Sequence, residues 1–301
     1  MKKSTLFFSL FLAVAYTLSL TAQPNTDSAV IKTIKINDHI HMLQWSGAGN
    51  MMLLSGKDGN ILVDDQFAPL SEKIRKAIQD VSKGDVKFLF NTHFHGDHTG
   101  GNENFGNWGA TILAHENVRA RMMGDSSKLK FAKTPTPAAA KALPVMTYAA
   151  GMNVYLNTED IIIFHVDNAH TDGDAVLYLP KSNVVHTGDC FMKDRFPYID
   201  RSSGGSFAGW LVAVTKILAV IDDKTVVMPG HGDLATKKDY QNIREAVENI
   251  FNLVKTQVNA GKTLEQVVAM KLTQPYESKF GGGFISGERL VTNMYGELKG
   301  N

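Results

Sequence analysis

Four side chains with metal-binding chemistry lie within six residues of this chain, in the segment His93-Phe94-His95-Gly96-Asp97-His98. The segment directly follows Val86–Phe90, a compact apolar run typical of a buried strand. Two histidines at positions i and i+2, leaving the end of a strand, can point the same way and bind one cation. Asp97 and His98 follow in the turn, where they can reach a second cation. The alternative is a solvated, histidine-rich loop.

Candidate partners for this cluster also follow apolar runs that predict strands. They lie further along the chain, and they are His170, Asp189 and His231. Because each candidate stands at the end of a predicted strand, we expect these ends to gather at one rim. The rim would then supply nitrogen and oxygen ligands for two metals. Such partners favour the metal site over the solvated loop.

The composition excludes several classes of protein. The chain is 44% hydrophobic and 20% charged, which excludes collagen-like, coiled-coil and disordered proteins. Its 31 Lys and Arg residues nearly balance 30 Asp and Glu residues, and no basic run is present, so neither nucleic acid nor an anionic membrane is an expected partner. The expected partner is a small-molecule substrate. With Cys190 as the single cysteine, no disulfide can form within the chain.

The N-terminus has the charged, apolar and small-residue order of a secretory signal peptide. Lys2 and Lys3 precede the apolar run Leu6–Leu20, and small residues follow at Thr21 and Ala22. A membrane anchor is the alternative, but the run is shorter than the about 18–20 residues that span a bilayer. We therefore predict a signal peptide over residues 1–22 and a mature domain over 23–301. The mature protein would be periplasmic or secreted, without stable membrane insertion.

The hydrophobic pattern along the rest of the chain predicts an α/β fold. Short apolar or alternating runs predict strands at 31–36, 39–45, 51–55, 61–64, 86–90, 111–114, 154–156, 161–166, 175–179, 184–187 and 226–228. Helical periodicity marks 70–81, 116–123, 209–221 and 243–258, and Thr263 with Gln266 resembles a capping box. Residues 124–150 and 188–209 are expected to be long loops. Strands and then helices occur twice, which predicts two sheets with helices outside.

The histidine motif and its partners resemble the metal motifs of the metallo-β-lactamase fold superfamily, over about residues 30–235 plus a helical C-terminal part. The resemblance implies a four-layer αββα sandwich. It also implies that the first metal is held by His93, His95 and His170, and the second by Asp97, His98 and His231, with Asp189 bridging the two. Zinc is the expected metal, two ions in all, and iron and manganese occur in relatives. An acid at the position of Asp64 would hydrogen-bond a ligand histidine.

One departure from the zinc β-lactamases concerns Asp189 and Cys190. In relatives with a ligating cysteine, a lysine three residues later meets the substrate carboxylate, and Cys190 and Lys193 have that spacing. However, Asp189 occupies the bridging position of hydrolases such as glyoxalase II. Adjacent side chains of an extended segment point to opposite sides, so both cannot readily bind one metal pair. We favour Asp189 as the ligand, because His98 already fills the second site, and expect Cys190 to be a small buried residue.

The resemblance and the ligand set together predict a metallo-hydrolase. The expected nucleophile is a metal-bridging hydroxide, oriented by Asp97 and Asp189 as catalytic residues. Lys193, Arg195 and Tyr198, in the following loop, are candidates for binding a carboxylate or phosphate of the substrate.

Several functions fit these residues. The carbonyl attacked can belong to an ester, lactone, thioester or amide, including a lactam. The enzymatic alternative is a zinc β-lactamase proper. A non-catalytic metal- or partner-binding protein on the same scaffold, and a di-iron redox role, are alternatives of other classes. The sequence leaves open the physiological substrate, the loaded metal and the oligomeric state.

Overall fold

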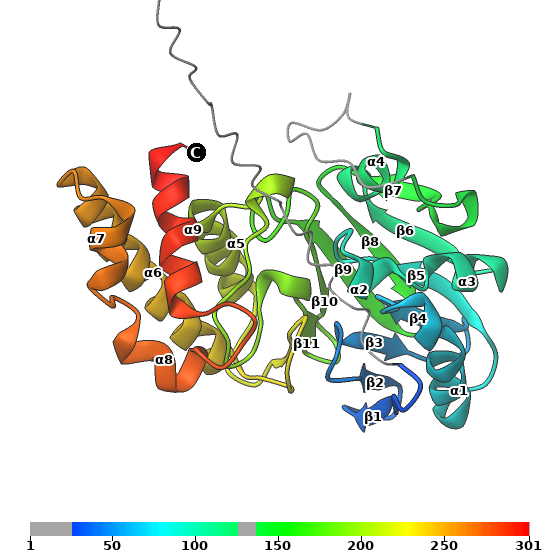
Figure 1. The fold of residues 1–301 in the computed structure, drawn as a ribbon. Coiled ribbons are helices and arrows are strands. Elements are labelled where there is room, and N and C mark those ends of the chain that lie inside the picture. Colours follow the sequence, from blue (N-terminus) through cyan, green and yellow to red (C-terminus); the bar gives the residue numbers. More distant parts are fainter. Residues whose placement is uncertain (1–25, 126–136, 301) are drawn as a thin grey trace, which may run out of the picture.

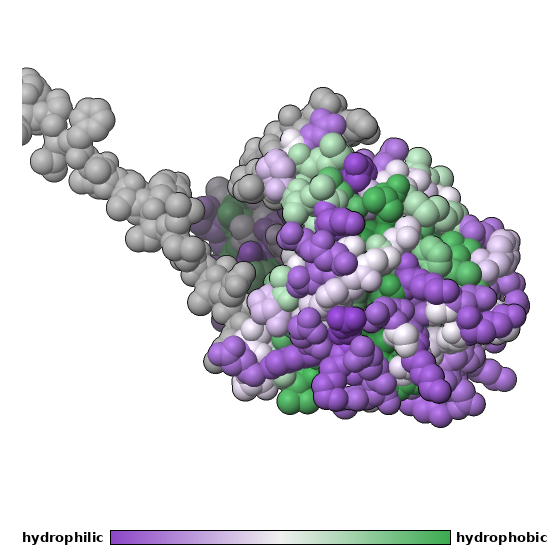
Figure 2. Space-filling model, turned by 90° about the vertical axis from the view of Figure 1, so that its right-hand side faces the viewer, coloured by the Kyte–Doolittle hydropathy of each residue, from purple (hydrophilic) through white to green (hydrophobic). Residues whose placement is uncertain are grey.

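A computed structural model describes residues 26–125 and 137–300 of the chain. The predicted signal peptide at residues 1–22 and part of the loop predicted at 124–150 lie outside these ranges. Within them, no helix combines the length and apolar character needed to cross a bilayer. Hydrophilic residues cover most of the face shown in Figure 2, with smaller hydrophobic areas between them.

The described strands form two sheets that share no strand (Figure 1). The seven-stranded sheet has its strands in chain order: β1 (Lys32–Lys35), β2 (Ile40–Gln44), β3 (Met51–Leu54), β4 (Asn60–Val63), β5 (Val86–Phe90), β6 (Thr111–His115) and β7 (Met146–Tyr148). The first four strands pair antiparallel, and β4 to β7 pair parallel. The carboxyl ends of β4, β5 and β6 therefore lie at one edge of this sheet.

The five-stranded sheet has the order β12-β11-β10-β9-β8. Its strands are β8 (Gly151–Leu156), β9 (Glu159–His165), β10 (Ala175–Leu179), β11 (Val184–His186) and β12 (Val226–Met228). The predicted hairpin of β10 and β11 is confirmed, with Leu179 paired to Val184. β11 and β12 are parallel, so the segments that follow both strands leave the sheet on the same side.

The helices cover the outer faces of the two sheets. They are α1 (Ser71–Val81), α2 (Gly96–Thr99), α3 (Asn102–Asn107), α4 (Glu116–Met123), α5 (Phe207–Val220), α6 (Lys237–Asn259), α7 (Leu264–Ala269), α8 (Gln274–Phe280) and α9 (Gly287–Lys299). Short 3-10 turns are η1 (Ala68–Leu70), η3 (Ala140–Ala142), η4 (Gly188–Cys190) and η5 (Arg201–Ser203). The predicted capping box of Thr263 and Gln266 begins α7.

Three buried apolar clusters separate four layers. Side chains of both sheets meet between them, as Phe90 and Leu177 do. Leu89, on the other face of β5, packs with Ile74 of α1. On the far side, strand residues such as Val176 pack beneath α5, α6 and α9. The predicted αββα sandwich is therefore confirmed, and the alternation along each buried strand produces it because successive side chains feed opposite layers.

The sequence prediction is wrong about part of the segment 124–150. Residues 146–148 form β7, which extends the seven-stranded sheet beside β6, and residues 140–142 form η3. A three-residue strand after Pro144 is too short to show a period of two. The helix expected from residue 209 begins earlier, at Phe207, because the Ser206 side chain caps it by accepting a hydrogen bond from the Gly209 amide.

Candidate metal centre

The candidate ligands arrive from both sheets at one rim. His93 and His95 lie in the turn after β5, and Asp97 and His98 belong to the short helix α2. The other sheet contributes three residues from the segments after β9, β11 and β12, namely His170, Asp189 and His231. All seven predicted ligand residues are thus brought together, in two adjoining groups.

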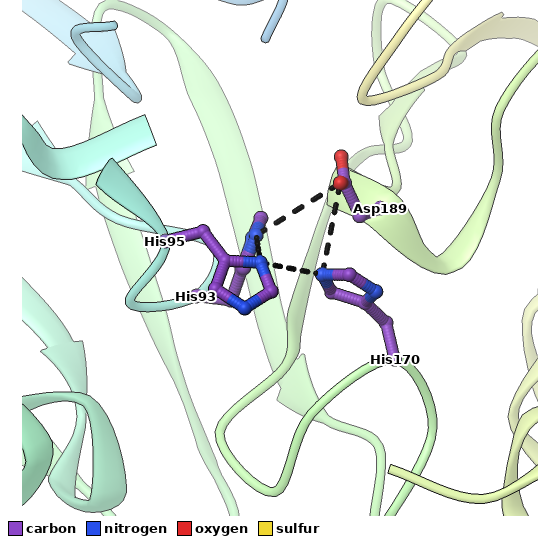
Figure 3. Close-up of side chains that lie close together, drawn as sticks. All are labelled: His93, His95, His170 and Asp189. Carbon is purple, nitrogen blue, oxygen red and sulfur yellow. Dashed lines mark hydrogen bonds and ion pairs between the residues drawn. The ribbon is translucent and has the colours of Figure 1, made fainter. Parts of the chain in front are cut away.

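The first group consists of His93, His95, His170 and Asp189 (Figure 3). The Nδ1 atom of His95 lies 3.2 Å from Nε2 of His93 and 2.9 Å from Nε2 of His170. The Oδ2 atom of Asp189 lies 4.0 Å from Nε2 of His93 and 3.6 Å from Nε2 of His170. One ligand atom from each residue therefore faces a common point, with all of them within 4.8 Å of one another.

The second group consists of Asp97, His98 and His231. The Oδ2 atom of Asp97 lies 3.6 Å from Nε2 of His98 and 3.3 Å from Nε2 of His231. Asp189 also reaches this group, because its Oδ1 lies 3.2 Å from Nε2 of His98 and its Oδ2 lies 3.3 Å from Nε2 of His231. The Asp189 carboxylate therefore stands between the two groups, where the resemblance expected a bridging acid.

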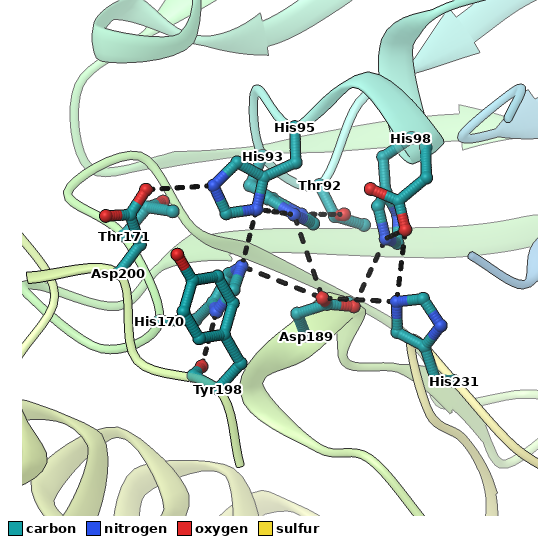
Figure 4. Close-up of polar contacts among 12 residues, drawn as sticks. Thr92, His93, His95, His98, His170, Thr171, Asp189, Tyr198, Asp200 and His231 are labelled. Atoms are coloured by element: carbon teal, nitrogen blue, oxygen red, sulfur yellow. Dashed lines mark hydrogen bonds and ion pairs between the residues drawn. The ribbon is translucent and has the colours of Figure 1, made fainter. Parts of the chain in front are cut away.

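Three histidines are oriented by hydrogen bonds to their outer ring nitrogen, which is the nitrogen that points away from the ligand groups (Figure 4). Nδ1 of His98 lies 2.7 Å from Oδ2 of Asp64, and Nε2 of His95 lies 3.0 Å from Oδ2 of Asp200. Nδ1 of His170 lies 2.7 Å from the Tyr198 carbonyl oxygen. Each of these oxygens accepts, so the outer nitrogen carries the proton, and the inner nitrogen of a neutral ring presents a lone pair.

This donor set fits a divalent metal ion. Lone pairs of His95 and His170 that face each other at 2.9 Å repel unless a cation or proton lies between them. The Nε2 of His98 and the Oδ1 of Asp189 are buried without a hydrogen-bond partner. Their 3.2 Å approach is an electrostatic contact, and unpartnered polar atoms are costly inside a protein. Imidazole and carboxylate ligands with hydrogen-bonded outer atoms are typical of zinc and similar metals.

The two ligand groups differ in the charge of their histidines, because burial and neighbouring charges shift the pKa values differently in each group. Burial lowers the pKa of His93 well below its usual 6.5 and that of His170 to about 4, so both rings are neutral. Burial opposes the charged form of Asp189 as well, but the His231 and His98 rings hold its pKa well below 3.8. The pKa of His231 rises to about 9 despite burial, because Asp189 and Asp97 stabilise its charged form. The second group therefore attracts positive charge.

A glycine lets the backbone lie very close to the Asp189 carboxylate. Gly230 precedes His231, and a Cβ atom built on it would lie 2.0 Å from Oδ1 of Asp189. Any side chain at this position would displace the carboxylate that joins the two groups.

The candidate substrate residues are only partly brought to the site. A cavity of about 430 Å³ opens above the ligand groups, and Arg195 and Tyr198 line it together with Asp97 and Asp189. Lys193 does not line it, and its Nζ donates to the Leu234 carbonyl at 2.8 Å. Met192 pairs with His231 as an isolated bridge and faces the cavity, so the next side chain along this extended segment points away. Lys193 is therefore not brought to this cavity, and its role in binding substrate stays a prediction.

Cys190 lies outside both ligand groups. It is fully buried, and its Sγ lies 3.8 Å from Oδ2 of Asp174. This agrees with the expectation that Asp189 rather than Cys190 belongs to the candidate ligand groups. The expected contact of Asp64 with a ligand histidine is also confirmed, on His98.

Sequence reasoning missed two acidic contacts that shape the rim. Asp200 reaches His95 across 105 positions of the chain. Asp172 forms a buried ion pair with Arg121 of α4, whose Nη2 lies 2.6 Å from Oδ2. The contacts join segments far apart in sequence, and no local motif marks either acid.

Comparisons with known proteins place this arrangement in a family. The model of the metallo-beta-lactamase superfamily matches residues 45–231. The metallo-beta-lactamase IND-1 of Chryseobacterium indologenes is 24% identical over 245 residues, covering 77% of this chain and 93% of that protein.

Two solved structures are similar in fold. A metallo-beta-lactamase from Pontibacter korlensis superposes with a TM-score of 0.59 at 17% identity, covering 73% of this chain and 99% of its own. The sec-alkylsulfatase Pisa1 from Pseudomonas sp. superposes with a TM-score of 0.69 at 16% identity, covering 89% of this chain and 50% of its own. The family model spans more than half of the sequence and includes all seven residues of the two candidate ligand groups. This chain therefore belongs to the metallo-β-lactamase superfamily.

Proposed function

We propose that this protein is a metal-dependent hydrolase that binds two metal ions, zinc by preference, and cleaves an ester, lactone, thioester or amide bond. The observation that carries the proposal is the convergence of seven nitrogen- and oxygen-bearing side chains below an open cavity. His93, His95 and His170 would hold one ion, and Asp97, His98 and His231 the other, with Asp189 shared between them. Bound ions would supply Lewis acidity to the scissile carbonyl and make hydroxide available near neutral pH.

The residues of the chain would divide the remaining work. Asp97 lines the cavity and lies against both rings of the second group, so its carboxylate would orient the attacking water and accept its proton. Asp189, which contacts both groups, would hold them at a fixed position relative to each other. The outer hydrogen bonds from Asp64 and Asp200 would hold the rings of His98 and His95 before substrate arrives.

Arg195 is the charged residue best placed to bind an anionic part of the substrate. It lines the main cavity and an adjoining cavity of about 160 Å³, and His231 lines both. Within the described ranges, no hydrogen bond or ion pair engages its guanidinium. A partly buried guanidinium without a partner would bind a carboxylate or sulfate strongly. A carboxylate is the choice that the acyl substrates above would supply.

β-Lactam hydrolysis is the second candidate function, favoured by the similarity to metallo-beta-lactamases over 93% of the length of one relative. The thiol of Cys190 faces away from the ligand groups, which argues for a centre of histidine and aspartate alone. Hydrolysis of nitrocefin by the pure protein, abolished by a chelator, would support this function.

The proposal is tested by metal analysis together with a substrate panel. Purified protein should contain about two metal ions per chain, identified by elemental analysis, and should cleave at least one ester, lactone, thioester or lactam. A chelator should abolish turnover, and added zinc should restore it. His95→Ala and Asp97→Ala should lose metal and activity together. Asp38→Asn, a change at an exposed acid on the surface, serves as the control.

Two results would contradict the proposal. One is turnover at the parent rate by His95→Ala protein that contains no metal. The other is full metal loading with no hydrolysis of any substrate, which would favour a binding protein on this scaffold. Iron in place of zinc would point to the redox alternative.

We also propose that the protein is exported, with residues 1–22 removed as a signal peptide. The basic, apolar and small-residue order of the N-terminus supports this proposal. N-terminal sequencing of the protein from its native cell should begin near Gln23, and an intact Met1 in a membrane fraction would favour an anchor.

A further inference from the structure

The cavity above the metal centre has a wall from the C-terminal helical part of the chain. Residues 281–286 connect α8 to α9 and lie beyond the segment 45–231 that matches the family model. Phe284, in this connection, lines the cavity, whose floor contains Asp97, Asp189 and His231. A segment distant in sequence from every candidate ligand therefore borders the space that a substrate would occupy.

The connection is held at both ends, and Phe284 lies between them. At one end, the Phe196 amide donates to the Phe280 carbonyl at 3.0 Å. At the other end, the Ser286 side chain caps α9. Gly283 packs on the stem of Arg195, since a Cβ built there would lie 2.9 Å from Cβ of Arg195. The position of Phe284 is therefore set by contacts with the cavity wall.

The ring of Phe284 is oriented but not covered. Its centroid lies 5.8 Å from that of Tyr198 in a T-shaped arrangement, and the Arg289 guanidinium lies 4.6 Å from the ring. Nevertheless, 71% of the residue is exposed. A large apolar side chain held in place at the border of a concave site, and left uncovered, is typical of a binding surface.

Other residues of the cavity lining are apolar as well, beside the charged Arg195 and the polar floor. Besides Phe284, the large apolar side chains that line it are Phe67, Met192, Phe196 and Tyr198. Water in such a space gains few hydrogen bonds, so an apolar group that displaces it binds favourably.

Resting on the proposed hydrolase function, we propose that Phe284 is a specificity-determining residue that binds an apolar group of the substrate, an alkyl chain or aromatic ring next to the scissile bond. The substrate class is then an acyl compound with a bulky apolar substituent, and small acyl compounds such as acetyl esters are poor substrates.

The test compares substrates that differ only in chain length. The metal-loaded protein is assayed with p-nitrophenyl acetate and p-nitrophenyl octanoate, and the binding of acetate and octanoate is measured by calorimetry. The two esters share one reactive group, and the two carboxylates share one charged group. The difference within each pair therefore reports only the effect of the longer alkyl chain. Phe284→Ala should lower kcat/KM for the octanoate ester by about 10-fold or more, mainly through KM, and leave the acetate ester unchanged. Phe284→Leu should restore part of the loss.

Tyr155→Ala is the matched control, because Tyr155 is an aromatic residue with 70% exposure on β8, outside the cavity lining. The proposal is overturned if Phe284→Ala weakens acetate and octanoate equally, or if Tyr155→Ala has the same effect. If neither ester is cleaved but octanoate binds in a Phe284-dependent way, ester hydrolysis fails and the subsite stands. If esters are cleaved without dependence on Phe284, the hydrolase stands and the subsite fails.

Discussion

At the scale of single residues, the candidate ligand histidines depend on partners that the motif does not contain. Asp200 illustrates this, since it accepts from Nε2 of His95 at 3.0 Å and is held by Ser202 and Ser203. We predict that Asp200→Ala weakens metal binding by about 10–100-fold and that Asp200→Asn keeps part of the affinity, because the amide oxygen can still accept. Competition with a chromophoric chelator measures both. Equal affinity in Asp200→Ala and parent protein would contradict this role.

A histidine outside the metal centre makes stability depend on pH. The rings of His115 and His165 stack with centroids 3.8 Å apart. Burial, and then His165, lower the pKa of His115 below 6.5, so the unfolded chain takes up this proton first as pH falls. Stability is therefore lost below about pH 6.5. Thermal melts should show that His115→Asn, which retains an acceptor to cap α4, loses less stability between about pH 7 and about pH 5 than the parent. An identical loss would contradict the prediction.

At the scale of elements, a buried ion pair joins α4 to the segment that carries His170. Arg121 and Asp172 form two short hydrogen bonds, and the guanidinium also lies 5.1 Å from the Phe94 ring. We predict that Arg121→Met or Asp172→Asn alone lowers the free energy of unfolding by about 3–5 kcal/mol, because each leaves a buried group unpaired. The double variant should lose less than the sum. Denaturant unfolding of the three variants measures this, and additive losses would exclude the coupling.

The elements also show which features a sequence reveals. Val86–Phe90 and the hairpin of β10 and β11 were predictable because buried runs and turn residues are local signals. The capping box at Thr263 was predictable for the same reason. Thr263→Ala should lower the free energy of unfolding, measured by urea denaturation, by about 1 kcal/mol. β7 could not be predicted, since its three residues gain their structure from pairing with β6. The contact of Asp200 with His95, the ion pair of Arg121 with Asp172 and the place of Phe284 in the cavity lining arise from tertiary packing alone.

At the scale of the whole molecule, the candidate metal centre joins the two sheets. The candidate ligands after β5 come from one sheet, and those after β9, β11 and β12 come from the other. Metal should therefore stabilise the folded chain as a ligand does, by about 4 kcal/mol at a free concentration of 1,000 times Kd. Melting temperature should fall when a chelator is added and recover with zinc. His95→Ala protein should melt at the same temperature with and without chelator. A chelator-induced fall in melting temperature as large as that of the parent would contradict the idea that metal joins the two sheets.

The cavity has a polar floor at the strand ends and an apolar wall from the connection at 281–286. In the proposed hydrolase, part of the substrate preference would therefore be encoded in a stretch of the gene separate from the one that encodes the candidate ligands. Variation in the C-terminal stretch would then change which molecules the proposed hydrolase accepts and leave the candidate ligands intact. A mutational library confined to residues 281–286 should yield many altered preferences and few inactive clones, whereas one aimed at Gly230 should yield mostly dead protein.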